Sequence, residues 1–376
     1  MPLLIVTILL FTLGLVMVFS ASNVTAYMLY VVNPYHYFVR QAIFLFAGLI
    51  IALVMIKFNT KVYGMLSWFL VLVVGGSLVL LLMVGQVQNQ AIRWFDLGFF
   101  SVQPSEFIKV ITIIWLARYY EVNEKKLKKS WATSLFPLGI CGVIAILIFL
   151  NPDLGTTIIY SVIVFAIFLA VPISKEIKTK TLFGIIGAIA IVAFTLMGSG
   201  KTVMLERQME RLNFSKPCDR LLNTGSQICN GYIAINNGGL TGVGLGNSTQ
   251  KYLYLSEPYT DFIFTIIVEE LGLIIAIGII LLYMFVLYRI LWIGRQSYTN
   301  RGAVMCYGVA IYIFCHIAVN LLGIFGVMPM TGVPLPFMSY GGSFTICLIA
   351  ALTIVQRVSV ENGIRDNLKK EKIEKK

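Results

Sequence analysis

The sequence has few charged residues. Only 12% of its 376 residues are Asp, Glu, Lys or Arg, whereas 58% are hydrophobic, and the mean hydropathy is +0.87. Soluble domains contain about 25% charged residues, so this scarcity excludes a soluble globular domain and indicates a polytopic membrane protein. The net charge is +12, but lysines and arginines beside apolar runs mark the cytoplasmic side of a membrane protein before they suggest nucleic-acid binding.

Metal-binding and redox motifs are also scarce. His36 and His316 are the two histidines, they lie far apart, and no Cys-x-x-Cys pair exists, so a zinc site is not supported. Four of the six cysteines lie in apolar runs, where we expect small buried hydrophobic residues. Cys218 and Cys229 share a long polar segment instead. They are a candidate disulfide pair if that segment is extracellular.

The first 20 residues lack the basic region of a secretory signal peptide, so they are predicted to form a first spanning helix. Further apolar runs predict an all-α protein with about ten transmembrane helices, because each run is near the ~20 residues that span a bilayer. These runs cover about residues 37–56, 63–85, 104–119, 133–150, 155–173, 181–198, 261–288, 303–326 and 341–360.

The basic residues predict the orientation. Most of the 29 lysines and arginines fall on one side if the N-terminus is cytoplasmic. This asymmetry predicts that both termini are cytoplasmic and that a large extracellular loop, about residues 199–260, joins helices 7 and 8. We expect a single transmembrane domain over residues 1–360 and a charged cytoplasmic tail over residues 361–376 that favours anionic lipid.

An acidic stretch from Leu253 to Gly272 is unusual because it places three carboxylates at the start of an apolar run and within it. Asp261 lies where an apolar run begins, and Glu269 and Glu270 lie about 12 Å deeper at 1.5 Å of rise per residue. A charge near the bilayer centre costs roughly 2.5–3.5 kcal/mol. Either Asp261 caps the helix and the two glutamates pair with basic residues on neighbouring helices, or the three carboxylates mark a functional site.

Two connections on the predicted outer face carry further candidates. Arg93 and Trp94 lie at the membrane interface, where they are candidate ligands, although Trp94 also suits an aromatic belt. Asn151 to Thr157 joins two helices tightly. Asp153 within it either caps the following helix or belongs to the site.

A polar stripe is predicted on the helix that begins near Pro104. Gln103, Glu106 and Lys109 share one face at a spacing of three residues. Glu106 and Lys109 either form an internal ion pair that neutralises both charges, or the stripe faces the glutamates of the acidic stretch and braces the site around Asp261.

Two segments are rich in glycine or proline. The Gly-rich segment, Gly238–Gly246, matches neither GxGxxG nor a P-loop. Its backbone N–H groups could bind a phosphate, but it is predicted to be a flexible connector. The Pro/Gly segment, Met328–Ser343, contains three prolines and three glycines among apolar residues. Irregular backbone at membrane depth must be buried or line a cavity, so this segment is predicted to be a shaped wall for a lipid chain.

Four of these stretches, in this order, resemble the signatures of the SEDS family, which includes FtsW, RodA and SpoVE. The matching blocks are RW…QPSE…K, NPDLGTT, GVGLGNSTQKYLYLSEPYTDFIF…EELG and MTGVPLPFMSYGGS. The similarity covers about residues 40–358. Residues 211–214, 217–220 and 247–251 look more like FtsW of Gram-positive type than RodA. The family commonly has Gln at Asn151 and differs at Ser256 and Pro258, but no ionisable group is lost.

The resemblance implies a ten-helix peptidoglycan glycosyltransferase in the bacterial plasma membrane. Such an enzyme polymerises lipid II at the outer face during cell division and releases undecaprenyl diphosphate. The implied partners are a class B penicillin-binding protein and other divisome membrane proteins at the septum. The family's essential acidic residue maps onto Asp261.

The chemistry of glycan polymerisation agrees with this implication. A base must remove the proton from the acceptor hydroxyl, and an outward-facing Asp261 suits that role. No organic cofactor is expected, whereas a divalent cation, Mg²⁺ or Mn²⁺, is a candidate to share the charge of the leaving diphosphate. The predicted substrate-binding residues are Arg93, Trp94, Lys109, Arg207, Arg211, Lys251 and Ser343, and the predicted supporting residues are Glu106, Asp153, Glu257, Glu269 and Glu270.

Two other classes of function remain open at this point. A lipid II flippase or proton-coupled transporter would also place carboxylates in the membrane, and Glu106, Lys109, Glu269 and Glu270 would then matter more than Asp261. A divisome scaffold without chemistry would tolerate the replacement of Asp261 by asparagine.

Overall fold

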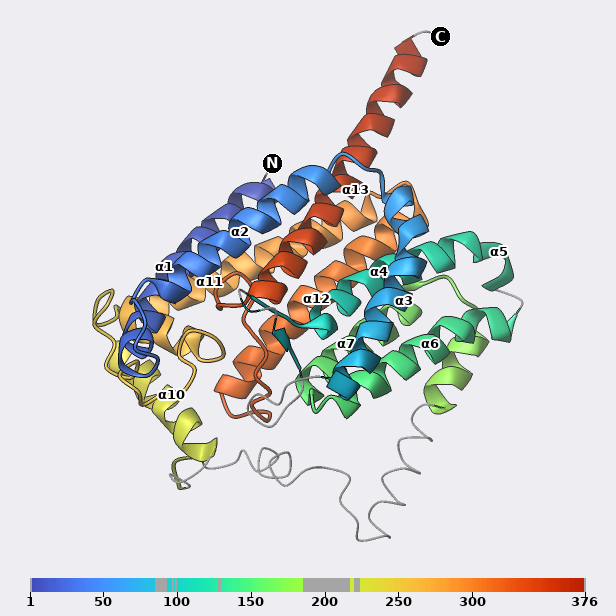
Figure 1. The fold of residues 1–376 in the computed structure, drawn as a ribbon. Helices are drawn as coiled ribbons and strands as arrows, with labels where there is room; N and C mark the ends of the chain where they lie inside the picture. The colour runs from blue at the N-terminus through green and yellow to red at the C-terminus, as the bar shows by residue number, and fades with distance from the viewer. Residues whose placement is uncertain are drawn as a thin grey trace, which may run out of the picture.

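The apolar runs form helices because lipid leaves no partner for an unpaired backbone N–H or C=O group. The computed structural model describes residues 2–84, 93–96, 98, 100–127, 130–184, 217–219 and 224–374. Figure 1 shows the arrangement of its elements. They are α1 (Pro2–Met28), α2 (His36–Met55), α3 (Thr60–Val84), β1 (Phe95–Asp96), β2 (Ser101–Val102), α4 (Pro104–Val122), α5 (Glu124–Leu127), α6 (Trp131–Leu150), α7 (Leu154–Ala170), the 3₁₀ helix η1 (Pro217–Asp219), α10 (Thr224–Gly238), α11 (Ile263–Arg295), α12 (Asn300–Ile324) and α13 (Gly342–Glu374).

Within these described ranges, seven helices are long and apolar enough to cross a membrane: α1, α2, α3, α6, α11, α12 and α13. The apolar helix α7 is shorter, and α4 carries buried ionisable side chains. The all-α, polytopic membrane architecture predicted from the sequence is therefore confirmed. The count of ten helices stays a prediction, because most of the apolar run at 181–198 lies outside the described residues.

Helix α12 lies at the centre of the bundle. It packs against α4, α7, α11 and α13. Of its most apolar 18-residue stretch, 67% is buried inside the protein. Helix α1 packs against α2 and α11, while α2 also packs against α13. The polar side chains of α4 therefore face a neighbouring helix and not lipid, which is the arrangement that buried ionisable groups require in a membrane.

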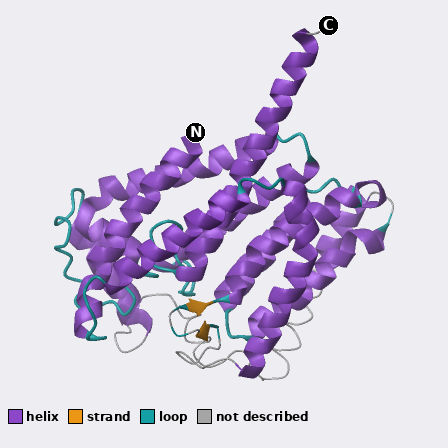
Figure 2. Cartoon of the chain, turned by 45° about the horizontal axis from the view of Figure 1, so that its top comes forward, coloured by secondary structure: helices purple, strands orange, loops and turns teal. Residues whose placement is uncertain are grey.

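The two ends of the bundle differ. Both termini lie at the same end, and α13 continues beyond the bundle as a helix (Figure 1), with residues 363–374 exposed. The β-ribbon lies at the opposite end (Figure 2), where Phe95 pairs with Val102. The basic residues near the termini predict that this opposite end is the outer face.

The long segment between α7 and α11 contains structure of its own. Its described part includes η1 and α10, and a disulfide joins Cys218 to Cys229 with an S–S distance of 2.08 Å. The disulfide predicted from the sequence is thus present. The candidate ligands Arg207 and Arg211 lie outside the described residues.

Candidate active site

Asp261 lies in the turn that precedes α11. Phe262 occupies the N-cap position and makes no side-chain cap hydrogen bond, so the interpretation of Asp261 as the helix cap is wrong: the helix begins one residue later than a cap at 261 requires. The Asp261 side chain is half-buried. Its Oδ2 lies 3.3 Å from the position that a Cβ atom would take on Gly332, whose φ is +71°. This left-handed conformation favours glycine, and a larger residue there would crowd the carboxylate.

The backbone around Asp261 is fixed by hydrogen bonds from two other elements. The amide of Asn320 on α12 donates to the carbonyls of Asp261 and Val333, both at 2.9 Å. Ser339 Oγ donates to the carbonyl of Thr260 at 2.6 Å. One Asn320 side chain thus holds two segments of the backbone, the turn at Asp261 and the Pro/Gly segment at Val333. The position of the Asp261 carboxylate therefore depends on α12 and on the Pro/Gly segment.

The Pro/Gly segment is itself anchored in the bundle. Tyr283 Oη donates to the carbonyl of Pro336 at 2.6 Å, and His316 Nδ1 lies 3.4 Å from the carbonyl of Pro334. A Cβ atom on Gly14 of α1 would lie 2.0 Å from the carbonyl oxygen of Phe337, so α1 packs directly on this backbone. The segment is a fixed wall, as predicted, and its role in holding a lipid chain stays a prediction.

Asp153 both caps a helix and organises a polar cluster. Its Oδ1 accepts a hydrogen bond from the N–H of Thr156 at 3.3 Å and lies 3.9 Å from Arg93 Nη1. Its Oδ2 accepts from Gln103 Nε2 at 3.1 Å. The Arg93 guanidinium also donates to the carbonyl of Pro152. The two interpretations of Asp153 as cap and as site component are therefore compatible.

This cluster lies against the Pro/Gly segment. A Cβ atom on Gly155 would lie 2.7 Å from Thr331 Cβ. Ser343 Oγ accepts from the N–H of Gln103 at 3.0 Å and donates to the carbonyl of Ser101 at 3.4 Å. Ser343 thus joins the β-ribbon to the start of α13, and we find a positioning contact where a substrate contact was predicted.

The stripe on α4 contains the predicted ion pair. Lys109 Nζ lies 2.8 Å from Glu106 Oε1, and the two side chains are 0% and 3% exposed. Lys109 Nζ also lies 2.9 Å from His316 Nε2. The prediction that the stripe faces the glutamates of the acidic stretch is wrong, because α12 lies next to α4 and supplies the polar partner.

His316 is a site residue that the sequence reasoning missed. It contacts Lys109 with one ring nitrogen and the Pro/Gly segment with the other, while its ring stacks on Phe344 at a centroid distance of 4.6 Å. The signal in the sequence was a histidine inside an apolar run, four residues before Asn320. That spacing puts both side chains on one face of a helix.

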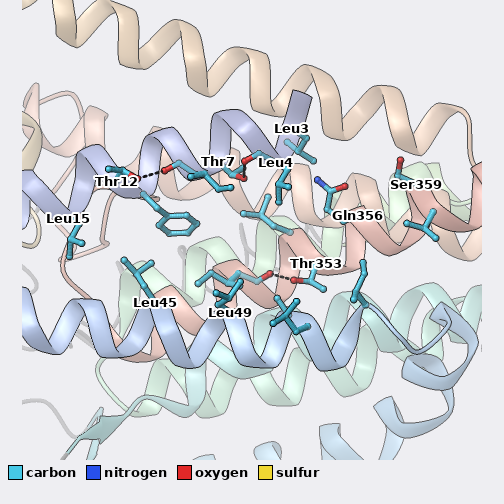
Figure 3. Close-up of a pocket in the computed structure, with 18 residues that line it drawn as sticks. Leu3, Leu4, Thr7, Thr12, Leu15, Leu45, Leu49, Thr353, Gln356 and Ser359 are labelled. Atoms are coloured by element: carbon cyan, nitrogen blue, oxygen red, sulfur yellow. Dashed lines mark hydrogen bonds between the residues drawn. The ribbon is translucent and has the colours of Figure 1, made fainter. Parts of the chain in front are cut away.

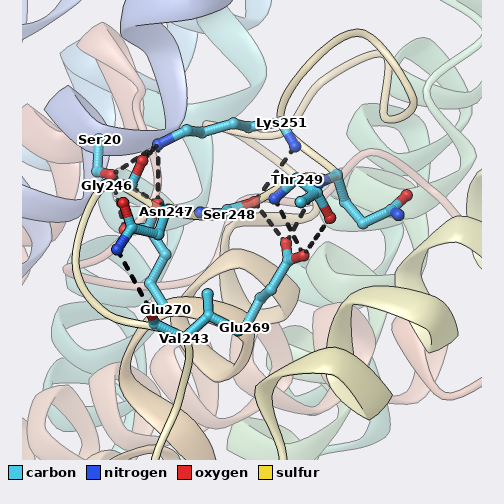
Figure 4. Close-up of polar contacts among 10 residues, drawn as sticks. Ser20, Val243, Gly246, Asn247, Ser248, Thr249, Lys251, Glu269 and Glu270 are labelled. Carbon is cyan, nitrogen blue, oxygen red and sulfur yellow. Dashed lines mark hydrogen bonds and ion pairs between the residues drawn. The ribbon is translucent and has the colours of Figure 1, made fainter.

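The two glutamates of α11 hold a single loop, residues 246–251 (Figure 4). Glu270 lies 3.0 Å from Lys251 Nζ and accepts a hydrogen bond of 2.6 Å from Ser20 Oγ on α1. Glu269 accepts from the hydroxyl of Ser248 and, at 2.9 Å, from that of Thr249. Each buried carboxylate therefore has partners, but Lys251 comes from the loop and not from a neighbouring helix as predicted.

The Gly-rich segment fills a break in α11. Gly272 has φ of +86° and ψ of 167°, which interrupts the helix. The N–H groups of Val243 and Gly244 donate to the carbonyls of Glu269 and Glu270 at 2.9 and 3.0 Å, which an unbroken helix would pair with residues 273 and 274. In return, the N–H groups of those two residues donate to the carbonyls of residues 239 and 240 at 3.0 and 3.3 Å.

The prediction that this segment is a flexible connector is therefore wrong. Its glycines permit backbone contact: a Cβ atom on Gly242 would lie 2.3 Å from the Glu270 carbonyl oxygen, and one on Gly238 would lie 2.1 Å from that of Val268. The segment fixes the part of α11 that carries the two glutamates.

Replacement of Gly272 by alanine is expected to destabilise the protein by about 2–4 kcal/mol, because the new Cβ combines backbone strain with overpacking. That Cβ would lie 2.4 Å from the Leu240 carbonyl oxygen. Thermal unfolding in detergent measures the effect. Gly278→Ala is the matched control in the same helix, since nothing lies within 4 Å of its Cβ position and alanine favours a helix. Equal midpoints for the two variants would contradict the role of the break.

Comparisons with known proteins place the chain in a family. A family model described as a cell cycle protein, FtsW/RodA/SpoVE, matches residues 1–364. The chain is 33% identical over 363 residues to the probable peptidoglycan glycosyltransferase FtsW of Coxiella burnetii, covering 94% of each chain. It is also 33% identical over 366 residues to the FtsW of Bacillus subtilis of the same description, covering 95% of this chain and 89% of that protein. The chain belongs to the FtsW/RodA/SpoVE family.

Solved structures share the fold of this chain. A chain of a peptidoglycan synthase complex that coordinates polymerization and crosslinking superimposes with a TM-score of 0.77 at 23% identity, over 96% of this chain and 97% of that one. The rod shape determining protein RodA of Thermus thermophilus gives a TM-score of 0.67 at 23% identity, over 96% of both chains. At this identity the likeness concerns the fold.

In this FtsW/RodA/SpoVE-family chain, the predicted cationic ligands differ in accessibility. The side chain of Arg93 is 22% exposed, whereas those of Lys109 and Lys251 are 0% and 1% exposed. The two lysines neutralise buried carboxylates, so direct contact with a substrate, predicted for both, is not supported. Trp94 is half-buried next to Arg93, and its contact with substrate stays a prediction.

Glu257 lies in the same outer turn as Asp261. Burial raises the pKa of its carboxyl, and hydrogen bonds from Thr260 and Tyr259 lower it by less. Because burial disfavours the ionised carboxylate in the folded protein, the protein loses stability as the pH rises through the raised pKa of Glu257. Below the pKa of the unfolded chain this penalty is absent.

Glu257→Gln is therefore expected to raise the thermal midpoint at pH 8 and to leave it unchanged near pH 4. Thermal scans in detergent at the two pH values measure the difference. The control is Glu124→Gln, since the Glu124 side chain is exposed. A gain that is the same at both pH values would contradict the effect of burial on Glu257.

Proposed function

We propose that the chain is a peptidoglycan glycosyltransferase that polymerises lipid II at the outer face of the bacterial plasma membrane and releases undecaprenyl diphosphate. The names of its relatives support the activity, and the family assignment supports the membrane context. The observation that carries the proposal is the position of Asp261, a half-buried carboxylate at the outer end of α11 whose backbone is fixed by Asn320.

Asp261 acts in this proposal as the general base. Its carboxylate takes the proton from the acceptor's sugar hydroxyl while that oxygen bonds to the anomeric carbon of the donor. The bond between this carbon and the diphosphate oxygen breaks, so the configuration inverts and the electron pair leaves with the diphosphate. Because diphosphate is a good leaving group, one carboxylate is sufficient. The proton on Asp261 then passes to water.

Arg93 is the described candidate for the charge of the leaving diphosphate. Its guanidinium is partly exposed and held by Asp153 and the Pro152 carbonyl, and a fixed donor at a developing negative charge lowers the barrier. Lys109 acts indirectly, through His316 and the Pro/Gly segment. Lys251 acts through Glu270 on α11.

A divalent cation, Mg²⁺ or Mn²⁺, is the proposed cofactor. Among the residues that the structure describes, no three His, Cys, Asp or Glu side chains gather in one place. Mg²⁺ is commonly held by one or two carboxylates together with substrate phosphates, so a cation here would be shared between Asp261 and the diphosphate. The base role of Asp261 does not depend on it.

A class B penicillin-binding protein is the proposed partner, and the division septum the proposed location. The structural neighbour from a peptidoglycan synthase complex supports a partner that crosslinks the glycan. The proposed role in division rests on the FtsW relatives. A role in sporulation is the alternative, because the stage V sporulation protein E of Bacillus subtilis is 34% identical to this chain.

The test uses purified protein in detergent, supplied with lipid II and a divalent cation, with and without a cognate penicillin-binding protein. Glycan length is read on a gel. We expect polymer in at least the sample that contains the partner. Folded protein that makes none with the partner present would overturn the proposal.

Transport of lipid II is the second candidate, and one observation favours it. Glu106, Lys109 and His316 form a buried group of ionisable side chains between α4 and α12, and such groups mark proton pathways in transporters. Transport requires a sealed vesicle, whereas polymerisation proceeds in detergent. Movement of labelled lipid II in vesicles, together with no polymer in detergent, would favour this second function.

A further inference from the structure

A groove lies between α1, α2 and α13 (Figure 3), and Asp261 is not among the residues that line it. Its volume is about 620 Å³, within the ~300–1,000 Å³ of small-molecule sites. The lining runs from Leu3 to Leu15 on α1, from Leu45 to Leu53 on α2 with Ile56 at its C-terminal end, and from Ile349 to Val360 on α13. It belongs to the half of the bundle that carries both termini.

Most of the lining is apolar, and the threonine hydroxyl groups in it already donate hydrogen bonds within the protein. Thr7, Thr12 and Thr353 donate their hydroxyl hydrogens to the carbonyls of their own helices at 2.9, 2.9 and 2.7 Å. Their polar atoms are therefore satisfied without a ligand. A lining of this kind offers water few partners, so a hydrocarbon chain is the occupant that its surface favours.

The length of the groove matches one leaflet. The twelve residues of rise from Leu3 to Leu15 span about 18 Å, close to half of a hydrocarbon core of about 30 Å. A groove of this depth matches the reach of one acyl chain in a single leaflet.

The cytoplasmic end of the groove is polar and basic. Gln356 and Ser359 line it there. Lys57 directly follows the lining residue Ile56, and its side chain is exposed. The nearby carboxylate of Glu361 is already engaged by Arg357 at 3.3 Å and by Thr60 at 2.7 Å, so it leaves the rim positive.

We propose that this groove binds one acyl chain of an anionic phospholipid of the inner leaflet, with its headgroup at Lys57. The ligand is distinct from the polyprenyl substrate, which acts at the other face. The chain wedges between α1 and α2 and so supports α1, whose Ser20 holds Glu270. An anionic headgroup gains about fivefold in affinity from one nearby lysine.

Native mass spectrometry of the full chain tests the proposal. The protein is incubated with equal amounts of phosphatidylglycerol and phosphatidylcholine and stripped of detergent. We expect wild type to retain one phospholipid, mainly phosphatidylglycerol. Ala52→Trp fills the groove and is expected to lower the occupancy at least fivefold. Val143→Trp adds the same bulk on the lipid-facing side of α6, where Val143 is 60% exposed, and is expected to retain the lipid.

A second variant, Lys57→Gln, tests the role of the charge. It is expected to lower the preference for phosphatidylglycerol over phosphatidylcholine about fivefold. Lys126→Gln, at an exposed cytoplasmic lysine of α5, is expected to leave it unchanged. No retained lipid in wild type, equal occupancy in both tryptophan variants, or retention of an added polyprenyl phosphate in place of phospholipid would each overturn the proposal.

A measurement on wild type covers the case in which Ala52→Trp does not fold. Phosphatidylglycerol with a photoreactive acyl chain is crosslinked to the protein, and the modified peptides are mapped. Crosslinks in α1, α2 and α13 support the groove, and crosslinks confined to other helices overturn it.

Discussion

Replacement of Asp261 by asparagine is expected to lower the rate of glycan polymerisation by about 10²–10⁴-fold, the usual contribution of a general base. Asparagine keeps the size of the side chain but has no basic oxygen. The Asn320 hydrogen bond goes to the backbone carbonyl of residue 261, so the substitution leaves it in place. The measurement is the initial rate of polymer formation from lipid II, with the partner present.

Asp96→Asn is the matched control for this experiment. Asp96 is an exposed carboxylate on β1 at the same outer face and accepts a hydrogen bond from the N–H of Gly98 at 2.9 Å. We expect its polymerisation rate to equal that of wild type. Equal rates for the Asp261 variant and wild type would keep the polymerase but remove Asp261 as its base.

Replacement of Lys251 by methionine is expected to destabilise the protein by about 3–5 kcal/mol, because it leaves a buried carboxylate without its cation. The Lys251 and Glu270 side chains are 1% and 0% exposed, so water does not screen the remaining charge. Methionine fills a similar volume, which separates the loss of charge from the loss of packing. The thermal midpoint in detergent measures the effect.

The double variant Lys251→Met with Glu270→Gln tests the cause. Removal of both charges is expected to restore most of the lost stability, since a neutral amide can still accept from Ser20. Lys126→Met, at an exposed position, is the control for the lysine replacement and is expected to have no effect. A midpoint for Lys251→Met equal to wild type would mean that another group neutralises Glu270.

The two largest expected effects concern the two ends of one stretch. Asp261 lies in the turn before α11, and Glu270 lies in its third turn, next to the break at Gly272. The carboxylate at the outer end is partly exposed and the deeper one is buried and paired. The first suits proton transfer with a ligand, whereas the second stabilises the fold.

Several features followed from the sequence alone. The scarcity of charge and the length of the apolar runs determined the membrane class, because lipid admits few other structures. Contacts between residues close in the chain also followed: the Glu106–Lys109 pair lies within one turn of α4, Asp153 caps α7, and Cys218 bonds to Cys229 eleven residues away. Helix geometry and short loops fix such contacts locally.

The tertiary structure decided how the stretches meet. Whether Lys109 faces Glu269 or His316 depends on which helix packs against α4, and residue spacing carries no information about the neighbour. The partner of Glu270 and the insertion of the Gly-rich segment at Gly272 depend on a loop that folds back onto its own following helix. Asn320 reaches Asp261 only because α12 lies at the centre of the bundle. Side chains far apart in the chain meet through the rotation and register of packed helices, which the packing of the whole bundle sets.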